Sequence, residues 1–127
     1  MSRKKLLILD DDQTLGKTIA VVANATGWDA TSVASAQDVL EVISDKEYDC
    51  FLTDYHMPGE NGLEVIECVR NLHCSIPAVI MSGSPLHLNC FQKESLGIID
   101  FMQKPFGYRE LKLVLAKVSD MGLVMAA

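Results

Sequence analysis

The chain has 127 residues, the size of one globular domain, and its 49% hydrophobic and 22% charged residues exclude disordered, collagen-like and disulfide-scaffold proteins. Acidic residues outnumber basic ones by 17 to 11, and the only basic cluster is Arg3, Lys4 and Lys5, so we expect no direct nucleic-acid binding by this domain. Apolar runs are far shorter than the roughly 20 residues of a membrane span, and the N-terminus is unlike a signal peptide, so we expect no membrane contact and a cytoplasmic location.

Short apolar runs alternate with segments of helical periodicity along the chain. The apolar runs predict strands over residues 5–9, 29–33, 50–53, 78–81 and 98–102. The periodic segments predict helices over residues 14–26, from Ser35 onward, and over 62–72, 86–95 and 108–118. The sequence therefore predicts five strand–helix units in succession.

Strands that alternate with helices favour a parallel sheet, with right-handed crossovers that place helices on both faces. We predict a single doubly wound (βα)5 domain. It is a flavodoxin-like three-layer α/β sandwich, with a five-stranded parallel sheet in the order 2-1-3-4-5. Ligands of such folds bind beyond the carboxyl ends of the strands, so the residues that directly follow each strand are the candidates for function.

Acidic, basic and hydroxyl side chains follow four of the predicted strands: Asp10, Asp11 and Asp12, then Asp54, Ser82 and Lys104. Asp10, Asp11 and Asp54 are expected to meet in one crevice, where their mutual repulsion favours a bound divalent cation. Mg2+ fits best, because one or two carboxylates normally hold it together with water and phosphate oxygens. With Lys104 as counter-charge and Ser82 as hydroxyl donor, this set predicts phosphoryl transfer, with Asp54 as the nucleophile.

Simpler explanations cover the remaining polar and sulfur-containing residues. Asp12 precedes a predicted helix, and we expect it to be the N-cap of that helix. The cysteines lack metal-knuckle spacing and are expected to be reduced, buried packing residues: Cys50, Cys68, Cys74 and Cys90. The histidines form no pair with metal-ligand spacing: His56, His73 and His87.

Four short motifs follow the predicted strands in order: Leu9-Asp10-Asp11, the loop from Asp54 through Met57-Pro58 to Asn61-Gly62, Met81-Ser82-Gly83, and Lys104-Pro105-Phe106. Together they resemble the motifs of response-regulator receiver domains, the phosphoacceptor domains of two-component signalling. The similarity extends over residues 4–118. A cis bond before Pro105 is expected to fix Lys104, because this uncommon isomer is usually kept for a reason.

The resemblance implies that Asp54 accepts a phosphoryl group from a histidine kinase, a histidine phosphotransfer protein or acetyl phosphate. It implies Mg2+ as the cofactor, with four ligands or ligand-orienting groups: Asp10, Asp11, Asp54 and the backbone carbonyl of His56. It also implies that Ser82 and Lys104 hold the phosphoryl oxygens. The domain is then a phosphoprotein that relays a signal, and we do not expect it to be an enzyme.

The resemblance further implies a conformational switch. Phe101 matches an aromatic position that moves inward when the hydroxyl residue, here Ser82, moves toward the phosphoryl group. Phe lacks the hydroxyl of the more common tyrosine, so this switch must depend on packing alone. The surface that changes is formed by the fourth helix, the fifth strand and the fifth helix, and we expect it to bind an output domain, a partner or a second copy of the chain.

Three alternative functions compete with this interpretation. Residues 6–14 also fit the nucleophile motif of haloacid-dehalogenase-like phosphatases, in which Asp10 is the nucleophile and Asp12 the acid/base, but the sequence has no acidic pair after Lys104 to hold the metal. A flavodoxin-like FMN site lacks its phosphate loop after the first strand. An interaction domain with a decayed site conflicts with the presence of every expected site residue.

We place the receiver domain at residues 1–120 and interpret 121–127 as a C-terminal tail, an extension of the last helix or the stub of a linker. A free-standing receiver and the receiver part of a longer regulator both fit the sequence. The cognate kinase is not encoded in any motif.

Overall fold

The computed structural model describes residues 3–72, 75–85 and 90–126. Five strands and five helices alternate along the chain: β1 (Lys4–Leu9), α1 (Gln13–Ala25), β2 (Trp28–Val33), α2 (Ala36–Asp45), β3 (Cys50–Asp54), α3 (Gly62–Asn71), β4 (Ala78–Ser82), α4 (Cys90–Leu96), β5 (Ile98–Gln103) and α5 (Tyr108–Ala126). The predicted five strand–helix units are confirmed.

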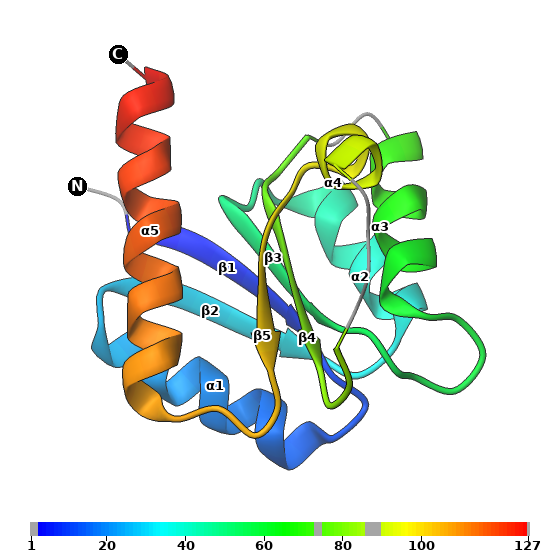
Figure 1. The fold of residues 1–127 in the computed structure, drawn as a ribbon, viewed down its shortest axis with the longest axis horizontal. Helices are drawn as coiled ribbons and strands as arrows, with labels where there is room; N and C mark the ends of the chain where they lie inside the picture. Colours follow the sequence, from blue (N-terminus) through cyan, green and yellow to red (C-terminus); the bar gives the residue numbers. More distant parts are fainter. Residues whose placement is uncertain (1–2, 73–74, 86–89, 127) are drawn as a thin grey trace.

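The five strands form one parallel sheet in the order β2-β1-β3-β4-β5, as predicted (Figure 1). Its register aligns the carboxyl ends of the strands: Leu9 lies opposite Thr53, and Asp54 lies opposite Met81. At the next pair, Ser82 lies opposite Gln103. The residues that end the three central strands and β5 therefore share one edge of the sheet.

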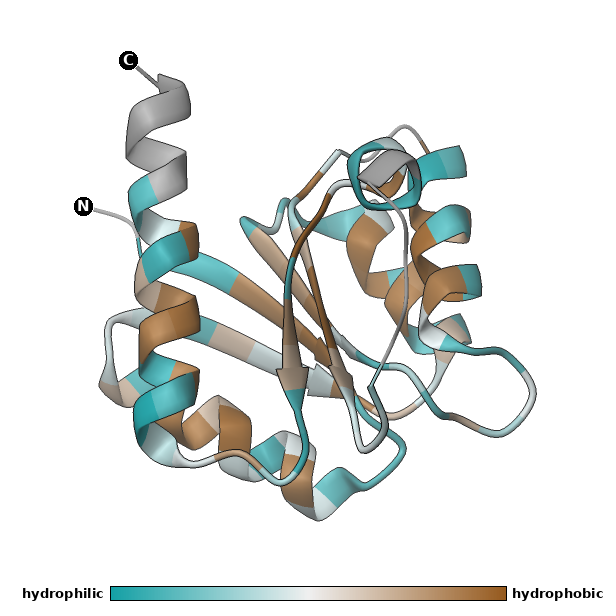
Figure 2. Cartoon of the chain, in the orientation of Figure 1, coloured by the Kyte–Doolittle hydropathy of each residue, from teal (hydrophilic) through white to brown (hydrophobic). Residues whose placement is uncertain are grey.

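Helices cover both faces of the sheet, α1 and α5 on one side and α2, α3 and α4 on the other (Figure 1). Side chains of a strand alternate between the faces, so Leu6 and Ile8 pack with the first pair of helices, and Leu7 and Leu9 pack with the second group. The helices α1, α2, α3 and α5 turn apolar residues toward the sheet and polar residues outward (Figure 2). Burial of these two apolar layers holds the strand ends in fixed positions.

Side-chain caps fix where three of the helices begin. Asp12 accepts a hydrogen bond from the Leu15 amide at the start of α1, which confirms the predicted N-cap. Ser35 caps α2 in the same way, by accepting from Asp38. At α3, Asn61 and Glu64 form a reciprocal capping box.

The last two helices differ from their predicted bounds. The predicted fourth helix covers residues 86–95, of which 86–89 lie outside the described residues, and α4 begins at Cys90. The predicted fifth helix ends at residue 118, whereas α5 continues to Ala126 through most of the predicted tail. None of the helices in the described residues has the length and apolar character needed to cross a membrane.

Two of the four cysteines have described side chains. Cys50 is buried and free, and burial, with a smaller effect of the Asp49 charge, raises the pKa of its thiol to about 12. Cys68 is free and partly buried. Both agree with the packing interpretation, whereas the side chains of Cys74 and Cys90, like His73 and His87, lie outside the described residues.

Candidate functional site

Three carboxylates meet beyond the ends of β1 and β3. Asp10 directly follows β1 and Asp54 is the last residue of β3, which is the neighbouring strand in the sheet. One carboxylate oxygen from each of Asp10, Asp11 and Asp54 lies within 4.8 Å of the others. Asp10 is 1% exposed and Asp54 is 6% exposed, while Asp11 is exposed. The structure therefore brings together the three acids that the sequence predicted to converge.

Asp12 does not belong to this cluster of acids. Its side chain accepts from the Leu15 amide and caps α1, while its backbone amide donates to Oδ1 of Asp10 at 2.9 Å. The turn after β1 therefore orients one oxygen of Asp10 and directs the third aspartate away.

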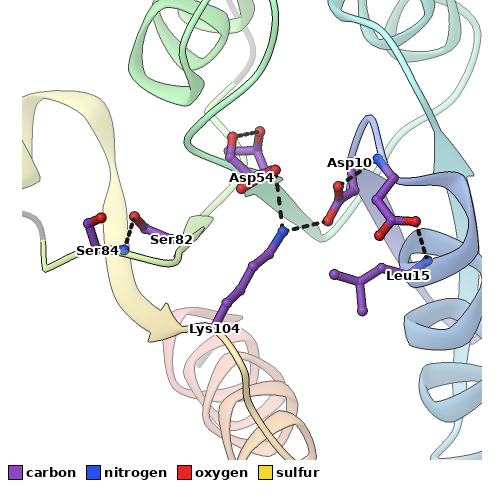
Figure 3. A network of polar contacts seen from close by, with 8 residues as sticks. Asp10, Leu15, Asp54, Ser82, Ser84 and Lys104 are labelled. Carbon is purple, nitrogen blue, oxygen red and sulfur yellow. Dashed lines mark hydrogen bonds and ion pairs between the residues drawn. The ribbon is translucent and has the colours of Figure 1, made fainter.

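Lys104 reaches into the cluster from the loop that follows β5. Its Nζ lies 2.9 Å from Oδ2 of Asp10 and 3.3 Å from Oδ2 of Asp54, so one ammonium bridges both buried carboxylates (Figure 3). The Lys104 amide donates to the carbonyl of Ser82 at 2.7 Å, and the Lys104–Pro105 bond is cis, as expected. The lysine backbone is thereby attached to the end of β4.

Burial and neighbouring charges have opposing effects on the pKa values of Asp54 and Lys104. Burial raises the pKa of Asp54, the nearby Lys104 ammonium lowers it, and the charges of Asp10 and Asp11 raise it, so that the pKa lies above its usual value. Burial alone lowers the pKa of Lys104, but its hydrogen bond to Asp10 and the charges of both carboxylates outweigh burial and raise the pKa. Lys104 is therefore a cation at neutral pH, in a site that still carries an excess of negative charge.

Ser82 ends β4, one strand over from Asp54, and is 3% exposed. Its Oγ accepts a hydrogen bond from the amide of Ser84 at 3.1 Å (Figure 3). The hydroxyl hydrogen is thus available for an acceptor in the site.

The loop between β3 and α3 is held closely against Asp54. The Gly62 amide donates to the carbonyl of Tyr55 at 2.8 Å, and a Cβ at residue 62 would lie only 2.6 Å from the backbone oxygen of Asp54. Only glycine fits there without a shift of the backbone. His56 lies in this loop with an exposed side chain that contacts the Tyr55 ring edge-on.

Phe101 lies on β5 directly opposite Ile80 of β4, and two residues farther along β4 on the same face is Ser82. The ring is partly buried and borders an open hollow of about 280 Å³, lined by Ile80, Ser82, Ser84, Pro85, Phe101, Met102 and Gln103. The hollow thus connects the predicted switch residue with the hydroxyl of the site.

The comparison with protein families agrees with this arrangement. A family model described as the response regulator receiver domain matches residues 6–116. The chain belongs to the response regulator receiver domain family. This match includes every residue of the site described above.

Known receivers resemble the domain in sequence and in fold. It is 30% identical over 113 residues to the phosphate regulon transcriptional regulatory protein PhoB of Pseudomonas aeruginosa, covering 87% of this chain and 49% of that protein. The CheY-like receiver of Methylobacillus flagellatus is 25% identical, with a TM-score of 0.81 over 92% of this chain and 99% of that chain. Chemotaxis protein CheY4 of Vibrio cholerae, at 19% identity, shares the fold with a TM-score of 0.84 over 92% of this chain and 99% of that chain.

The receiver domain spans about half the length of PhoB and about a quarter of two further curated relatives. Those relatives are therefore much longer than the part that this chain matches. Because it belongs to the receiver domain family, the chain is a signalling module of two-component systems.

Sequence reasoning missed how the acids and the lysine of this receiver are paired. The sequence predicts Lys104 as a counter-charge in the crevice but not its partners, and in the structure its Nζ lies closer to Asp10 than to Asp54. The pairing spans 94 residues of sequence and depends on the loop after β5 folding over the sheet edge. Nothing in the local pattern around either residue indicates which carboxylate the ammonium prefers.

Proposed function

We propose that the receiver domain accepts a phosphoryl group on Asp54 from a histidine kinase or a histidine phosphotransfer protein, in a reaction that requires Mg2+. The observation that carries this proposal is the placement of Asp54. Its nearly buried carboxylate ends the central strand β3, within 3.3 Å of the Lys104 ammonium and beside two further carboxylates.

The chemistry is a displacement at phosphorus. An oxygen of Asp54 forms the new O–P bond as the N–P bond to the donor imidazole breaks, and the imidazole leaves with its electron pair. Lys104 compensates negative charge on the phosphoryl oxygens, and the Ser82 hydroxyl donates a hydrogen bond to one of them. Ser82 ends β4 and Lys104 directly follows β5, so both side chains lie at the same edge of the sheet as Asp54.

The donor set fits Mg2+, which prefers hard oxygen ligands and binds few carboxylates. Asp11 and Asp54 would bind it directly, Asp10 would orient it or bind through water, and the backbone carbonyl of His56 would add another ligand. When bound, the ion supplies positive charge that stabilises the transferring phosphoryl group. Without it, the acids of this site have only Lys104 as counter-charge among the described residues.

The geometry disfavours Asp10 as the nucleophile, which the phosphatase alternative requires. Asp10 is 1% exposed, and each of its oxygens already accepts a hydrogen bond, one from Asp12 and one from Lys104. Asp54 is more exposed than Asp10, at 6% against 1%. Among the described residues, the ion pair of its Oδ2 with Lys104 is also longer than that of Asp10, at 3.3 Å against 2.9 Å. A phosphodonor therefore reaches Asp54 first.

Phosphorylation would then change the surface formed by α4, β5 and α5. If the Ser82 hydroxyl turns toward the phosphoryl group, the hollow beside it can receive the Phe101 ring, and the contacts of β5 with α4 change. We expect this surface to contact an output domain, a separate partner or a second copy of the receiver. The match covers about half of PhoB, which is a transcriptional regulatory protein, and this is consistent with an output domain.

The direct test is to incubate the protein with acetyl phosphate or a histidine kinase and to locate the phosphoryl group by mass spectrometry. One phosphoryl group at Asp54 is expected with Mg2+, none after metal removal, and none in Asp54→Asn. Asp12→Asn serves as the matched control, because asparagine also caps a helix. A label that persists in Asp54→Asn and is lost in Asp10→Asn would replace this proposal by the phosphatase.

A further inference from the structure

A lysine of α4 lies over the ring of Phe101. Lys93 Nζ is 5.4 Å from the ring centroid, within the range of a cation–π interaction. Both side chains are partly buried, which limits the competition from water. Among the residues that the structure describes, the three ion pairs involve Lys104 and Lys117, so Lys93 forms none. The aromatic ring is therefore its electrostatic partner in this part of the chain.

The helix that carries Lys93 is attached at its C-terminal end. Arg70 of α3 donates from Nε and Nη2 to the carbonyl of Leu96, at 2.9 Å and 2.6 Å. Leu96 is three residues after Lys93 and therefore lies on the same side of α4. The ammonium consequently reaches the ring from a helix end that α3 fixes in place.

Phe101 has two possible surroundings. In the structure its ring contacts Lys93 and packs with the apolar cluster under α3 and α4, whereas the hollow of about 280 Å³ beside it extends to Ser82. A phenyl ring has no hydrogen-bonding group, so no hydrogen bond from the ring distinguishes the two positions. The contact with the ammonium does distinguish them, because it exists only while the ring faces α4.

We propose that Lys93 holds the Phe101 ring in the position facing α4 and thereby opposes its movement into the hollow beside Ser82. Lys93 is then a positioning residue that sets which fraction of the unphosphorylated molecules has the Phe101 ring facing α4. The inference rests on the proposed function, since it concerns the switch that phosphorylation would operate. A cation–π contact at a partly exposed site shifts such an equilibrium by roughly two- to five-fold.

The test uses the full chain labelled with ¹³C in its phenylalanine rings. Phe101→Leu identifies the Phe101 signal, which is first recorded without Mg2+ or phosphodonor. Lys93→Gln removes the charge and keeps a good helix former, so the signal should move toward the position reached when beryllofluoride, a phosphoryl mimic, saturates the wild type. Lys93→Arg retains a cation for the ring and should restore the wild-type signal.

The affinity for beryllofluoride with Mg2+ supplies a second readout. Because the ligand and the ring position are linked, Lys93→Gln should strengthen binding about two- to five-fold. Lys112→Gln is the matched control: Lys112 Nζ lies 5.0 Å from the Tyr108 ring on α5, and its loss should change neither the Phe101 signal nor the affinity. In the Phe101→Leu background, Lys93→Gln should have no effect.

The inference is overturned if Lys93→Gln leaves the Phe101 signal and the affinity at their wild-type values. It is also overturned if the substitution strengthens binding equally in the Phe101→Leu background, because the effect then bypasses the ring. Failure of the proposed function looks different. The wild type would not bind beryllofluoride at Asp54, while the signal of Phe101 without ligand would still report on the contact with Lys93.

Discussion

Replacing Asp54 by Asn should stabilise the protein when no divalent cation is present. Asp54 is nearly buried beside Asp10 and Asp11, and Lys104 is the only described cation in contact with it. The substitution keeps the size and shape of the side chain but removes one of three converging negative charges. It therefore measures whether the site is electrostatically strained without a metal.

The magnitude follows from the distances. The carboxylate oxygens lie no more than 4.8 Å apart, and at an effective dielectric constant of about 20 this upper limit corresponds to a repulsion of about 3.5 kcal/mol for each pair. The attraction to Lys104 at 3.3 Å is about 5 kcal/mol on the same basis, so the two repulsions exceed it by about 2 kcal/mol. Water screens the exposed Asp11, so we expect Asp54→Asn to raise the free energy of unfolding by about 1–2 kcal/mol.

Urea unfolding at pH 7 in a chelating buffer measures this difference. Trp28 is 4% exposed, so its fluorescence reports loss of the core. Saturating Mg2+ should reverse the order of stability, because the ion binds the folded wild type more tightly than the variant. Asp12→Asn is the control, since this residue caps α1 outside the cluster and should change stability by less than about 0.5 kcal/mol.

The pH dependence of the free energy of unfolding tests independently whether the Asp54 charge destabilises the folded protein. The pKa of Asp54 is raised in the folded state, so the folded protein binds a proton more tightly than the unfolded chain does. The destabilisation by the Asp54 charge is therefore present above the folded pKa and is lost as the pH falls through it, so the advantage of Asp54→Asn should shrink in acid. Equal or lower stability of the variant at pH 7 in the chelating buffer would refute this electrostatic reasoning.

Three further substitutions test the geometry around the site. Asp11→Ala should weaken Mg2+ binding in calorimetry more than Asp12→Ala, and equal losses would contradict the placement of Asp12 as a cap. Asn61→Ala should lower the free energy of unfolding by about 1 kcal/mol through loss of the capping box, and an unchanged urea midpoint would argue against it. Gly62→Ala should cost about 1–3 kcal/mol and slow phosphorylation, because the new Cβ would displace the Asp54 backbone, and a wild-type phosphorylation rate would show that the loop yields without moving Asp54.

The order of elements and the location of the site were readable from the sequence. Continuous apolar runs such as residues 6–9 identify strands buried on both faces, and strands of that kind require helical crossovers. Parallel strands bring their carboxyl ends to one edge, which places Asp10, Asp54 and Ser82 together without any knowledge of side-chain contacts. The cap at Asp12 was equally predictable, because capping is a local interaction.

The boundaries of α3 and α5 depend on local sequence signals. Asn61 and Glu64 have the three-residue spacing of a capping box, which marks the start of α3 at Gly62. The last helix extends beyond its predicted end at residue 118, because residues 121–126 carry no stop signal and α5 continues to Ala126.

The tertiary structure alone decided which charges and rings pair across the sheet edge. The preference of Lys104 for Asp10 over Asp54 and the position of Lys93 over Phe101 depend on loop and helix placement to within an ångström or two. Sequence periodicity specifies the face on which a residue lies, but electrostatic contacts depend steeply on distance between groups far apart in the chain. The fold could therefore be predicted from the pattern of apolar residues, whereas the balance of charges that governs the site required the packed molecule.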